Sequence, residues 1–196
     1  MSRSGDWFIR TYGDDVDDSA YDDFRILEEA REKAEQHILS AYNKILEERM
    51  EEVPHDDVSK LHSVAMHNLS FHKEIWHAST KILPALEVQV VIDGENNCFV
   101  TTGSSGYVEF GMKPPIGMKL PIRCWIHTHP FGSAYFSGTD IRTVSIWLPN
   151  MECAYVLGGE GHYGYWSNDR PKELDVFVHN ILDYTQEWGT KEEEEE

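Results

Sequence analysis

Two histidines separated by one residue are the feature of this sequence with the clearest chemical potential. His127 and His129 end a run with alternating apolar residues that begins at Ile122, a pattern that predicts a β-strand. Side chains on a strand point alternately to its two faces, so both imidazoles would lie side by side on one face. Pro130 follows directly and predicts the end of the strand. The pair therefore predicts two nitrogen ligands at a strand end.

A carboxylate follows the histidine pair at the start of the next predicted helix. Ser137 and Asp140 precede a helical pattern over residues 141–148. Two imidazoles and a carboxylate give Zn²⁺ three ligands and leave the fourth tetrahedral position for water, which is typical of a catalytic site. There is also a structural interpretation, in which Ser137 and Asp140 form a helix capping box and the histidines are core residues. The combination at this spacing favours a metal site with ligands His127, His129 and Asp140.

The order of these residues resembles the signature of a known enzyme family. His-Thr-His-Pro at 127–130, followed by Ser137 and Asp140, is similar to the signature of the JAMM (MPN+) zinc metalloproteases, which cleave ubiquitin-like proteins from their conjugates. The wider run 125–143 is especially similar to the AMSH-type deubiquitinases. The resemblance covers about residues 70–185. It implies an α+β fold with a cytidine-deaminase-like mixed sheet flanked by helices.

The resemblance also implies a glutamate on an earlier strand that serves as general base and acid. Glu87 is the matching residue, and it stands before Gly94 as in the family. Within the apolar predicted strand 87–92 it is the odd residue, and a half-buried carboxylate there needs either a function or an edge position that faces water. Glu74 and Glu109 are lesser candidates.

The family mechanism gives each site residue an expected role. Glu87 would take a proton from zinc-activated water and pass it to the departing amine, and Ser137 would donate a hydrogen bond to the oxyanion. The substrate would be a ubiquitin-like or sulfur-carrier protein whose extended C-terminal tail binds by strand addition. AMSH-type enzymes also carry an insertion with a second zinc site, and nothing comparable lies between Leu157 and Pro171. We therefore do not expect selectivity for a ubiquitin linkage.

Two other classes of function remain open. A catalytically inactive MPN-type scaffold would use the same fold for assembly, with the long N-terminal helix as its contact, although here every ligand position is filled. A RadC-like protein shares a His-x-His-Pro signature, but its helical, DNA-associated N-terminal part is not evident. Zinc content, peptidase activity and DNA binding would separate the three.

The composition predicts a single acidic domain. The chain has 196 residues, and 35 acidic against 17 basic residues give a net charge of -18. Phosphate backbones and anionic lipids would repel it, so neither nucleic acid nor a membrane is an expected partner. Three cysteines without short spacing, the lack of a long apolar run and an N-terminus unlike a signal peptide predict a cytoplasmic protein.

Four segments are expected along the chain: an acidic mobile N-terminus at 1–18, a helical extension at 19–69, a JAMM/MPN+ catalytic domain at 70–190 and an acidic tail at 191–196. The pattern over 19–53 predicts one long amphipathic helix. This helix would either pack along the catalytic domain, which we favour, or form the seam of a homodimer.

The remaining patterns predict short elements around the histidine strand. Helices are expected at 70–83 and 171–188, and strands at 87–92, 98–102, 107–110, 153–157 and 162–166. The first three strands read as an antiparallel meander and the last two as a hairpin whose aromatic side chains join the core. Histidines recur every five residues at His62, His67, His72 and His77. This spacing scatters them around a helix, so we do not expect them to bind a metal.

Overall fold

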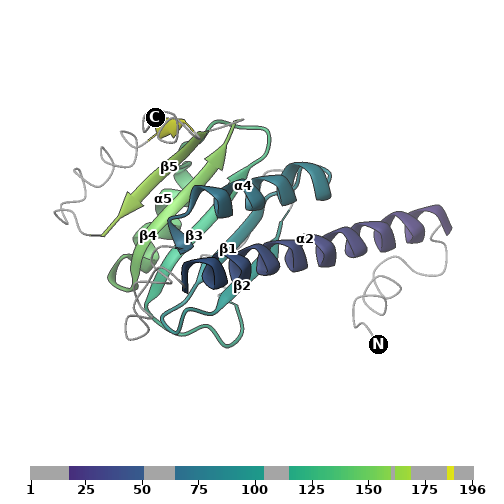
Figure 1. Ribbon diagram of the computed structural model, residues 1–196. Coiled ribbons are helices and arrows are strands. Elements are labelled where there is room, and N and C mark those ends of the chain that lie inside the picture. Colours follow the sequence, from purple (N-terminus) through teal and green to yellow (C-terminus); the bar gives the residue numbers. More distant parts are fainter. Residues whose placement is uncertain (1–17, 51–64, 104–114, 160–161, 169–184, 188–196) are drawn as a thin grey trace, which may run out of the picture.

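The computed structural model describes residues 18–50, 65–103, 115–159, 162–168 and 185–187. They form a six-stranded mixed sheet in the order β2-β1-β3-β4-β5-β6 (Figure 1). The strands are β1 Val88–Ile92, β2 Cys98–Thr102, β3 Ile122–His129, β4 Met151–Gly158, β5 His162–Ser167 and β6 Thr185–Glu187. Helices α2 (Asp18–Met50) and α4 (Leu69–His77) cover one face, and α5 (Gly138–Trp147) lies on the other. The chain is therefore of the α+β class.

One parallel strand pair divides an otherwise antiparallel sheet. β1 pairs antiparallel with both β2 and β3, and β4 pairs antiparallel with β5. β3 and β4 run parallel, and α5 is the connection between them. The antiparallel pairing of β1 with β2, which begins the predicted meander, and the predicted hairpin of β4 and β5 are confirmed. The third strand of the predicted meander, 107–110, lies outside the described residues.

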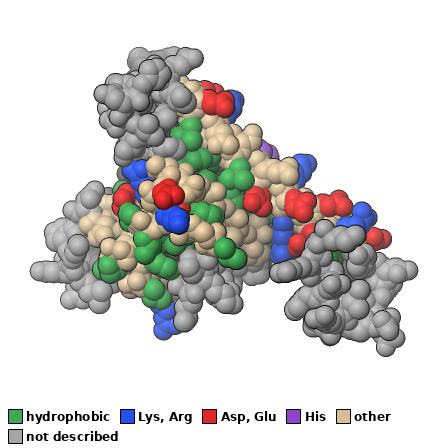
Figure 2. All heavy atoms as spheres, turned by 90° about the horizontal axis from the view of Figure 1, so that it is seen from below, with side chains coloured by type: hydrophobic (Ala, Val, Ile, Leu, Met, Phe, Trp, Pro, Cys, Tyr) green, Lys and Arg blue, Asp and Glu red, His purple; other side chains and the backbone are tan. Residues whose placement is uncertain are grey.

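The long N-terminal helix α2 packs against one face of the sheet. Ala34, Ile38, Tyr42 and Ile45 are buried and share one apolar cluster with α4 and with residues of β1, β3 and β4. The exposed side of α2 carries acidic and basic side chains next to one another, including Arg25 paired with Glu29 (Figure 2). The expected packing of this helix against the sheet is confirmed.

The helix before β1 begins and ends where its sequence indicates. The Asn68 side chain caps α4 by accepting hydrogen bonds from the backbone N–H groups of Ser70 and Phe71. The helix continues into a π-helical segment, η1 (Ala78–Ile82), and ends at Leu83, which is extended. Pro follows at position 84, and an X-Pro sequence disfavours helical backbone at X. The predicted helix 70–83 is confirmed.

Two histidines of the five-residue series have structural partners. Nε2 of the buried His72 lies 2.8 Å from the Met66 carbonyl oxygen, and Nδ1 of His67 lies 2.7 Å from the Tyr155 hydroxyl. Both hydrogen bonds help to satisfy polar atoms that burial would otherwise isolate from water. Position 62 lies outside the described residues.

The predicted C-terminal helix is wrong at its end. Residues 169–184 are outside the described part, but Thr185–Glu187 form strand β6, which pairs with β5. The edge of β5 has backbone N–H and C=O groups with which another strand can pair. The spacing of apolar residues is a local pattern and does not show which distant segment pairs there. Within the described ranges, no helix has the length and apolar character needed to cross a membrane.

Candidate metal centre

Strand β3 delivers both histidines of the motif to the face covered by α5. His127 is buried, and the side chain of His129 at the end of the strand is 13% exposed. Trp125, two residues earlier on the same face, stacks on the His127 ring with centroids 4.3 Å apart and an interplanar angle of 13°. The predicted strand, its end before Pro130 and the shared face of the two rings are confirmed.

The third residue of the group comes from the first turn of α5. Ser137 is the N-cap residue, and its hydroxyl accepts a hydrogen bond from the Asp140 N–H at 3.3 Å. In return the Asp140 carboxylate accepts a hydrogen bond from the Ser137 N–H at 2.6 Å. The capping box is therefore real, and it also orients the carboxylate. The structural and metal-binding interpretations of these residues are compatible.

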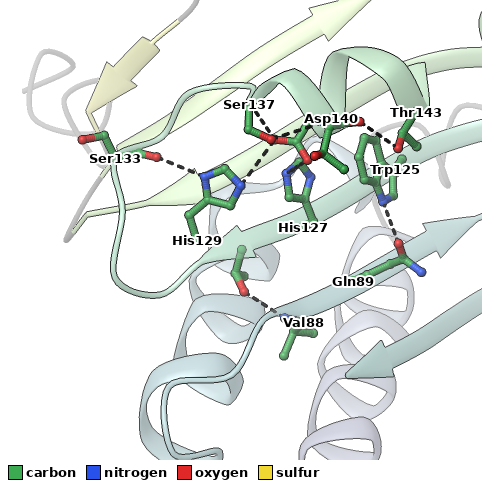
Figure 3. A network of polar contacts seen from close by, with 11 residues as sticks. Val88, Gln89, Trp125, His127, His129, Ser133, Ser137, Asp140 and Thr143 are labelled. Atoms are coloured by element: carbon green, nitrogen blue, oxygen red, sulfur yellow. Dashed lines mark hydrogen bonds and ion pairs between the residues drawn. The ribbon is translucent and has the colours of Figure 1, made fainter. Parts of the chain in front are cut away.

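His127, His129 and Asp140 converge on one point (Figure 3), with potential ligand atoms that all lie within 4.8 Å of one another. The Nε2 atoms of the two histidines lie 3.1 and 3.4 Å from Asp140 oxygens. Tetrahedral zinc with bonds of about 2.0–2.1 Å would hold its ligand atoms about 3.3 Å apart. Elsewhere in the described part of the chain, no other group of His, Cys, Asp or Glu has such geometry. These three residues could hold a metal ion.

The hydrogen bonds of the two rings also suit a metal ligand set. Nδ1 of His129 lies 3.4 Å from the Ser133 carbonyl oxygen, so a proton on Nδ1 leaves the Nε2 lone pair for a cation. Nδ1 of His127 is buried and has no hydrogen-bond partner among the described residues, whereas Nε2 lies 3.1 Å from an Asp140 oxygen. A cation held between Nε2 and this carboxylate would bind both groups at once.

The loop that carries Ser133 is held close to the end of β4. A Cβ atom at Gly158 would lie 2.5 Å from the Ser133 carbonyl carbon, so only glycine permits this approach. The Gly159 N–H also donates to the Gly132 carbonyl at 2.9 Å. The parallel neighbour of β3 thereby fixes the loop against which His129 is oriented.

Electrostatics favour a cation at this point. Burial alone would raise the pKa of Asp140, but His127, His129 and Ser137 outweigh it and hold the pKa well below its usual range. Burial likewise opposes protonation of His129, yet the carboxylates of Asp140 and Glu87 raise its pKa above the usual value. Two buried carboxylates around two imidazoles form an anionic environment that a divalent cation would neutralise.

Glu87 lies next to the group of three without being part of it. In the antiparallel register of β1 and β3, Gln89 is opposite His127. Continuing this register by two residues places Glu87 opposite His129 and on the same face. Glu87 is 8% exposed, and its charge acts on the His129 pKa. Of the lesser candidates, Glu74 pairs with His37 on α2, and position 109 lies outside the described residues.

The hydroxyl group of Thr128, the residue between the two histidines, connects strand β3 to the start of strand β1. Thr128 points to the opposite face of β3, where its Oγ1 accepts a hydrogen bond from Val88 N–H at 2.9 Å. The Ser79 hydroxyl lies 2.9 Å from the same oxygen and 2.6 Å from the Leu86 carbonyl oxygen. These contacts fix the backbone on both sides of Glu87 relative to His127 and His129.

Sequence reasoning missed a second chain of contacts behind His127. Trp125 Nε1 donates to Gln89 Oε1 at 3.0 Å (Figure 3). Gln89 Nε2 in turn donates to Thr101 Oγ1 at 2.9 Å. The alternation of β3 already placed Trp125 on the histidine face. The partnership with Gln89 depends on strand register, which the sequence does not reveal.

Comparison with known proteins gives no relative for this chain. No protein-family model, no curated protein and no solved structure matches it. The function must therefore be inferred from the geometry of the site and from the short motif that forms it.

Proposed function

We propose that this protein is a zinc-dependent isopeptidase or peptidase of the JAMM type, which cleaves ubiquitin-like or sulfur-carrier proteins from their conjugates. One observation carries the proposal: potential ligand atoms of two histidines and an aspartate lie within 4.8 Å of one another, and Glu87 comes two residues before Gln89, the residue opposite His127. Their order along the chain matches the JAMM signature described above. The described α+β architecture is compatible with the fold that this signature implies.

The donor set fits zinc better than harder cations. Two imidazole nitrogens and one carboxylate oxygen suit zinc, whereas Mg²⁺ and Ca²⁺ prefer oxygen ligands alone. A site with three protein ligands leaves a tetrahedral position for a reactant, as in catalytic zinc centres. Bound zinc would activate water for attack and polarise the carbonyl group of the substrate.

Two residues around the ligands have the chemistry that peptide hydrolysis requires. Glu87 would take a proton from the attacking water and return it to the departing amine. The Ser137 hydroxyl, which the capping box holds beside Asp140, would donate a hydrogen bond to the oxyanion of the attacked carbonyl. Burial of the ligands excludes most water and strengthens each of these interactions.

The proposed substrate is a protein with an extended C-terminal tail. Among the described strands, β2 forms the sheet edge next to β1, the strand that Glu87 precedes. An exposed edge is what strand addition by a tail requires. A reducing cytoplasm, which the three free cysteines suit, is the proposed location.

Metal content tests the proposal first. The full-length protein, purified after growth with zinc, is expected to contain one zinc per chain, and Asp140→Ala is expected to contain almost none. Asp22→Asn is a matched control, because Asp22 is an exposed residue of α2 far from the motif in sequence. Absence of zinc from the wild-type protein would favour the scaffold interpretation and contradict this one.

Glu87→Gln then separates metal binding from chemistry. The amide keeps the shape of the side chain but cannot accept the proton, so zinc content should persist while turnover falls by about 10²-fold or more. A panel of ubiquitin-like and sulfur-carrier proteins, each joined at its C-terminus to a fluorescent lysine peptide, provides the assay. Glu95→Gln on the exposed β1–β2 turn is the control. Full activity of Glu87→Gln would show that another group is the base.

A further inference from the structure

A cavity lies beside the candidate metal centre, between the α4–η1 helix and the loop that follows β3. It has a volume of about 710 Å³, within the usual range for ligand pockets of roughly 300–1,000 Å³. Lys73, Trp76 and Lys81 line its helical side, and Phe131 lines the opposite side. We refer to this cavity as the lysine pocket.

The lysine pocket is basic although the chain carries a net charge of -18. Its lining contains two lysines and His77 but no aspartate or glutamate. Lys73, His77 and Lys81 recur every four residues, which places them along one face of the helix. Neither lysine forms an ion pair with another described residue. The nearby carboxylate of Glu74 is already paired with His37 on α2.

The apolar part of the lining faces the same space. Trp76 contributes an aromatic surface from α4, and Phe131 is 75% exposed on the opposite wall. A large exposed aromatic residue beside a pocket is typical of a binding surface rather than of the core. Within the described part of the chain, the cavity thus combines apolar surface with positive charges that have no acidic partner.

The chain connects the lysine pocket directly to the metal ligands and to Glu87. The wall formed by residues 130–132 begins immediately after His129, and the Gly132 N–H donates to the His129 carbonyl at 3.0 Å. Ala85, two residues before Glu87, also lines the cavity. A protein segment bound there would lie next to the segments that hold the metal ligand and the candidate base.

We propose that the lysine pocket binds an acidic segment of the protein substrate. Carboxylates of that segment would pair with Lys73 and Lys81, and an apolar side chain between them would pack on Trp76. Elsewhere the acidic surface would repel such a segment, so the pocket would also fix where it docks. The identity of this segment as substrate rests on the proposed peptidase function, whereas binding itself does not.

A pair of peptides tests the charge requirement. Fluorescein-labelled Gly-Glu-Phe-Glu-Gly and its counterpart Gly-Gln-Phe-Gln-Gly are titrated with the full-length protein, and binding is followed by fluorescence anisotropy. The acidic peptide should bind about tenfold more tightly at low salt, and the difference should shrink at high salt because the lysines are exposed. Equal affinities at low salt would overturn the proposal.

Charge reversal locates the binding site. Lys73→Glu combined with Lys81→Glu should remove the preference for the acidic peptide. The control variant combines Lys33→Glu with Lys44→Glu on α2 and changes the net charge by the same amount. It should keep most of the preference for the acidic peptide, because these two lysines line a different hollow. Equal losses in both double variants would indicate a general charge effect and refute the assignment.

Two further variants separate this proposal from its rivals. In one outcome, Asp140→Ala binds the acidic peptide normally while the wild-type protein contains no zinc and cleaves no substrate. This outcome would support peptide binding by the lysine pocket and contradict the peptidase function. The acidic C-terminus, residues 192–196, is an alternative occupant. A tenfold gain in affinity when these five glutamates are changed to glutamine would assign the pocket to the tail and overturn the substrate assignment.

Discussion

At the scale of single residues, the two histidines differ in how they are held. His129 has a polar neighbour at each ring nitrogen, the Ser133 carbonyl at one and Asp140 at the other. His127 also has Asp140 at Nε2 but no described partner at Nδ1, and its ring stacks on Trp125, whose indole N–H donates to Gln89. An aromatic stack restricts ring rotation without competing for the ligand lone pair.

Gln89→Leu should weaken both the fold and the metal site. The substitution leaves the buried Trp125 N–H without its acceptor, which costs about 1–3 kcal/mol of unfolding free energy. It also frees the indole to shift away from His127, so zinc affinity should fall. Urea denaturation and competition with a zinc chelator measure the two effects. Gln36→Leu on the exposed side of α2 should change neither; an unchanged zinc affinity in Gln89→Leu would exclude this positioning role.

Local sequence predicted that the three candidate ligands lie together, but not what surrounds them. His127, His129 and Asp140 lie within one short segment, so strand alternation and a helix cap were enough to bring them together. Glu87 required a family pattern, because its place opposite His129 depends on pairing between distant strands. Register is a tertiary property, and a shift by one residue would turn Glu87 to the other face.

At the scale of elements, helix α2 belongs to the hydrophobic core although it precedes residues 70–185, the segment that carries the motif. Its stripe from Ala34 to Ile45 shares the cluster formed by α4 and one face of the sheet. Each Å² of apolar surface that this stripe removes from water stabilises the folded state by roughly 25 cal/mol. The helix is therefore part of the core on this face of the sheet.

Ile38→Ala should destabilise the protein by about 2–5 kcal/mol, because Ile38 is fully buried and its truncation leaves a cavity. Ile26→Ala on the same helix is the matched control, since Ile26 is 58% exposed, and should stay within about 0.5 kcal/mol. Chemical denaturation followed by circular dichroism measures both. Equal effects would show that α2 is only loosely attached.

The buried histidine of α4 should make stability depend on pH. Burial lowers the pKa of His72 to about 4, although its contact with the Met66 carbonyl acts in the opposite direction. In the unfolded chain His72 titrates near 6.5, so its neutral form favours folding above that pH. Below it, the unfolded state gains a proton that the folded state resists, and stability falls between pH 6.5 and 4.

Comparison with His72→Gln isolates this effect, since the amide can still donate to Met66. Between pH 7 and pH 5 the wild type should lose roughly 2 kcal/mol more unfolding free energy than the variant. Urea midpoints at both pH values provide the measurement. His67, whose pKa is lowered mainly by burial, contributes in the same direction in both proteins. Parallel losses would show that His72 takes up its proton without unfolding.

At the scale of the whole molecule, the proposed metal would connect strand β3 to helix α5. A ligand that binds only the folded state stabilises it by about 4 kcal/mol at a concentration 1,000-fold above its dissociation constant. Zinc should therefore raise the unfolding temperature of the wild-type protein, and a chelator should lower it. Asp140→Asn should respond to neither, as scanning calorimetry can establish. A thermal shift in that variant would place the zinc elsewhere.

The sequence predicted the overall arrangement unevenly. Amphipathic spacing identified α2 and α4, and alternation identified the two hairpins, because these signals are contained within each element. The parallel pairing of β3 with β4 and the strand character of Thr185–Glu187 depend on which edges are available. Such pairings involve neighbours that a local pattern does not contain.

Helix α5 connects two parallel strands and follows β3 directly along the chain, which affects the order in which the site forms. All three candidate ligands lie between residues 127 and 140, so bringing them together costs little chain entropy. Glu87 arrives only when β1 pairs with β3 across a much longer loop. During folding or synthesis, the cluster of candidate ligands can thus form before the proposed general base is in place. If the protein is the proposed zinc peptidase, a partly folded chain would bind zinc while still being unable to cleave a peptide bond.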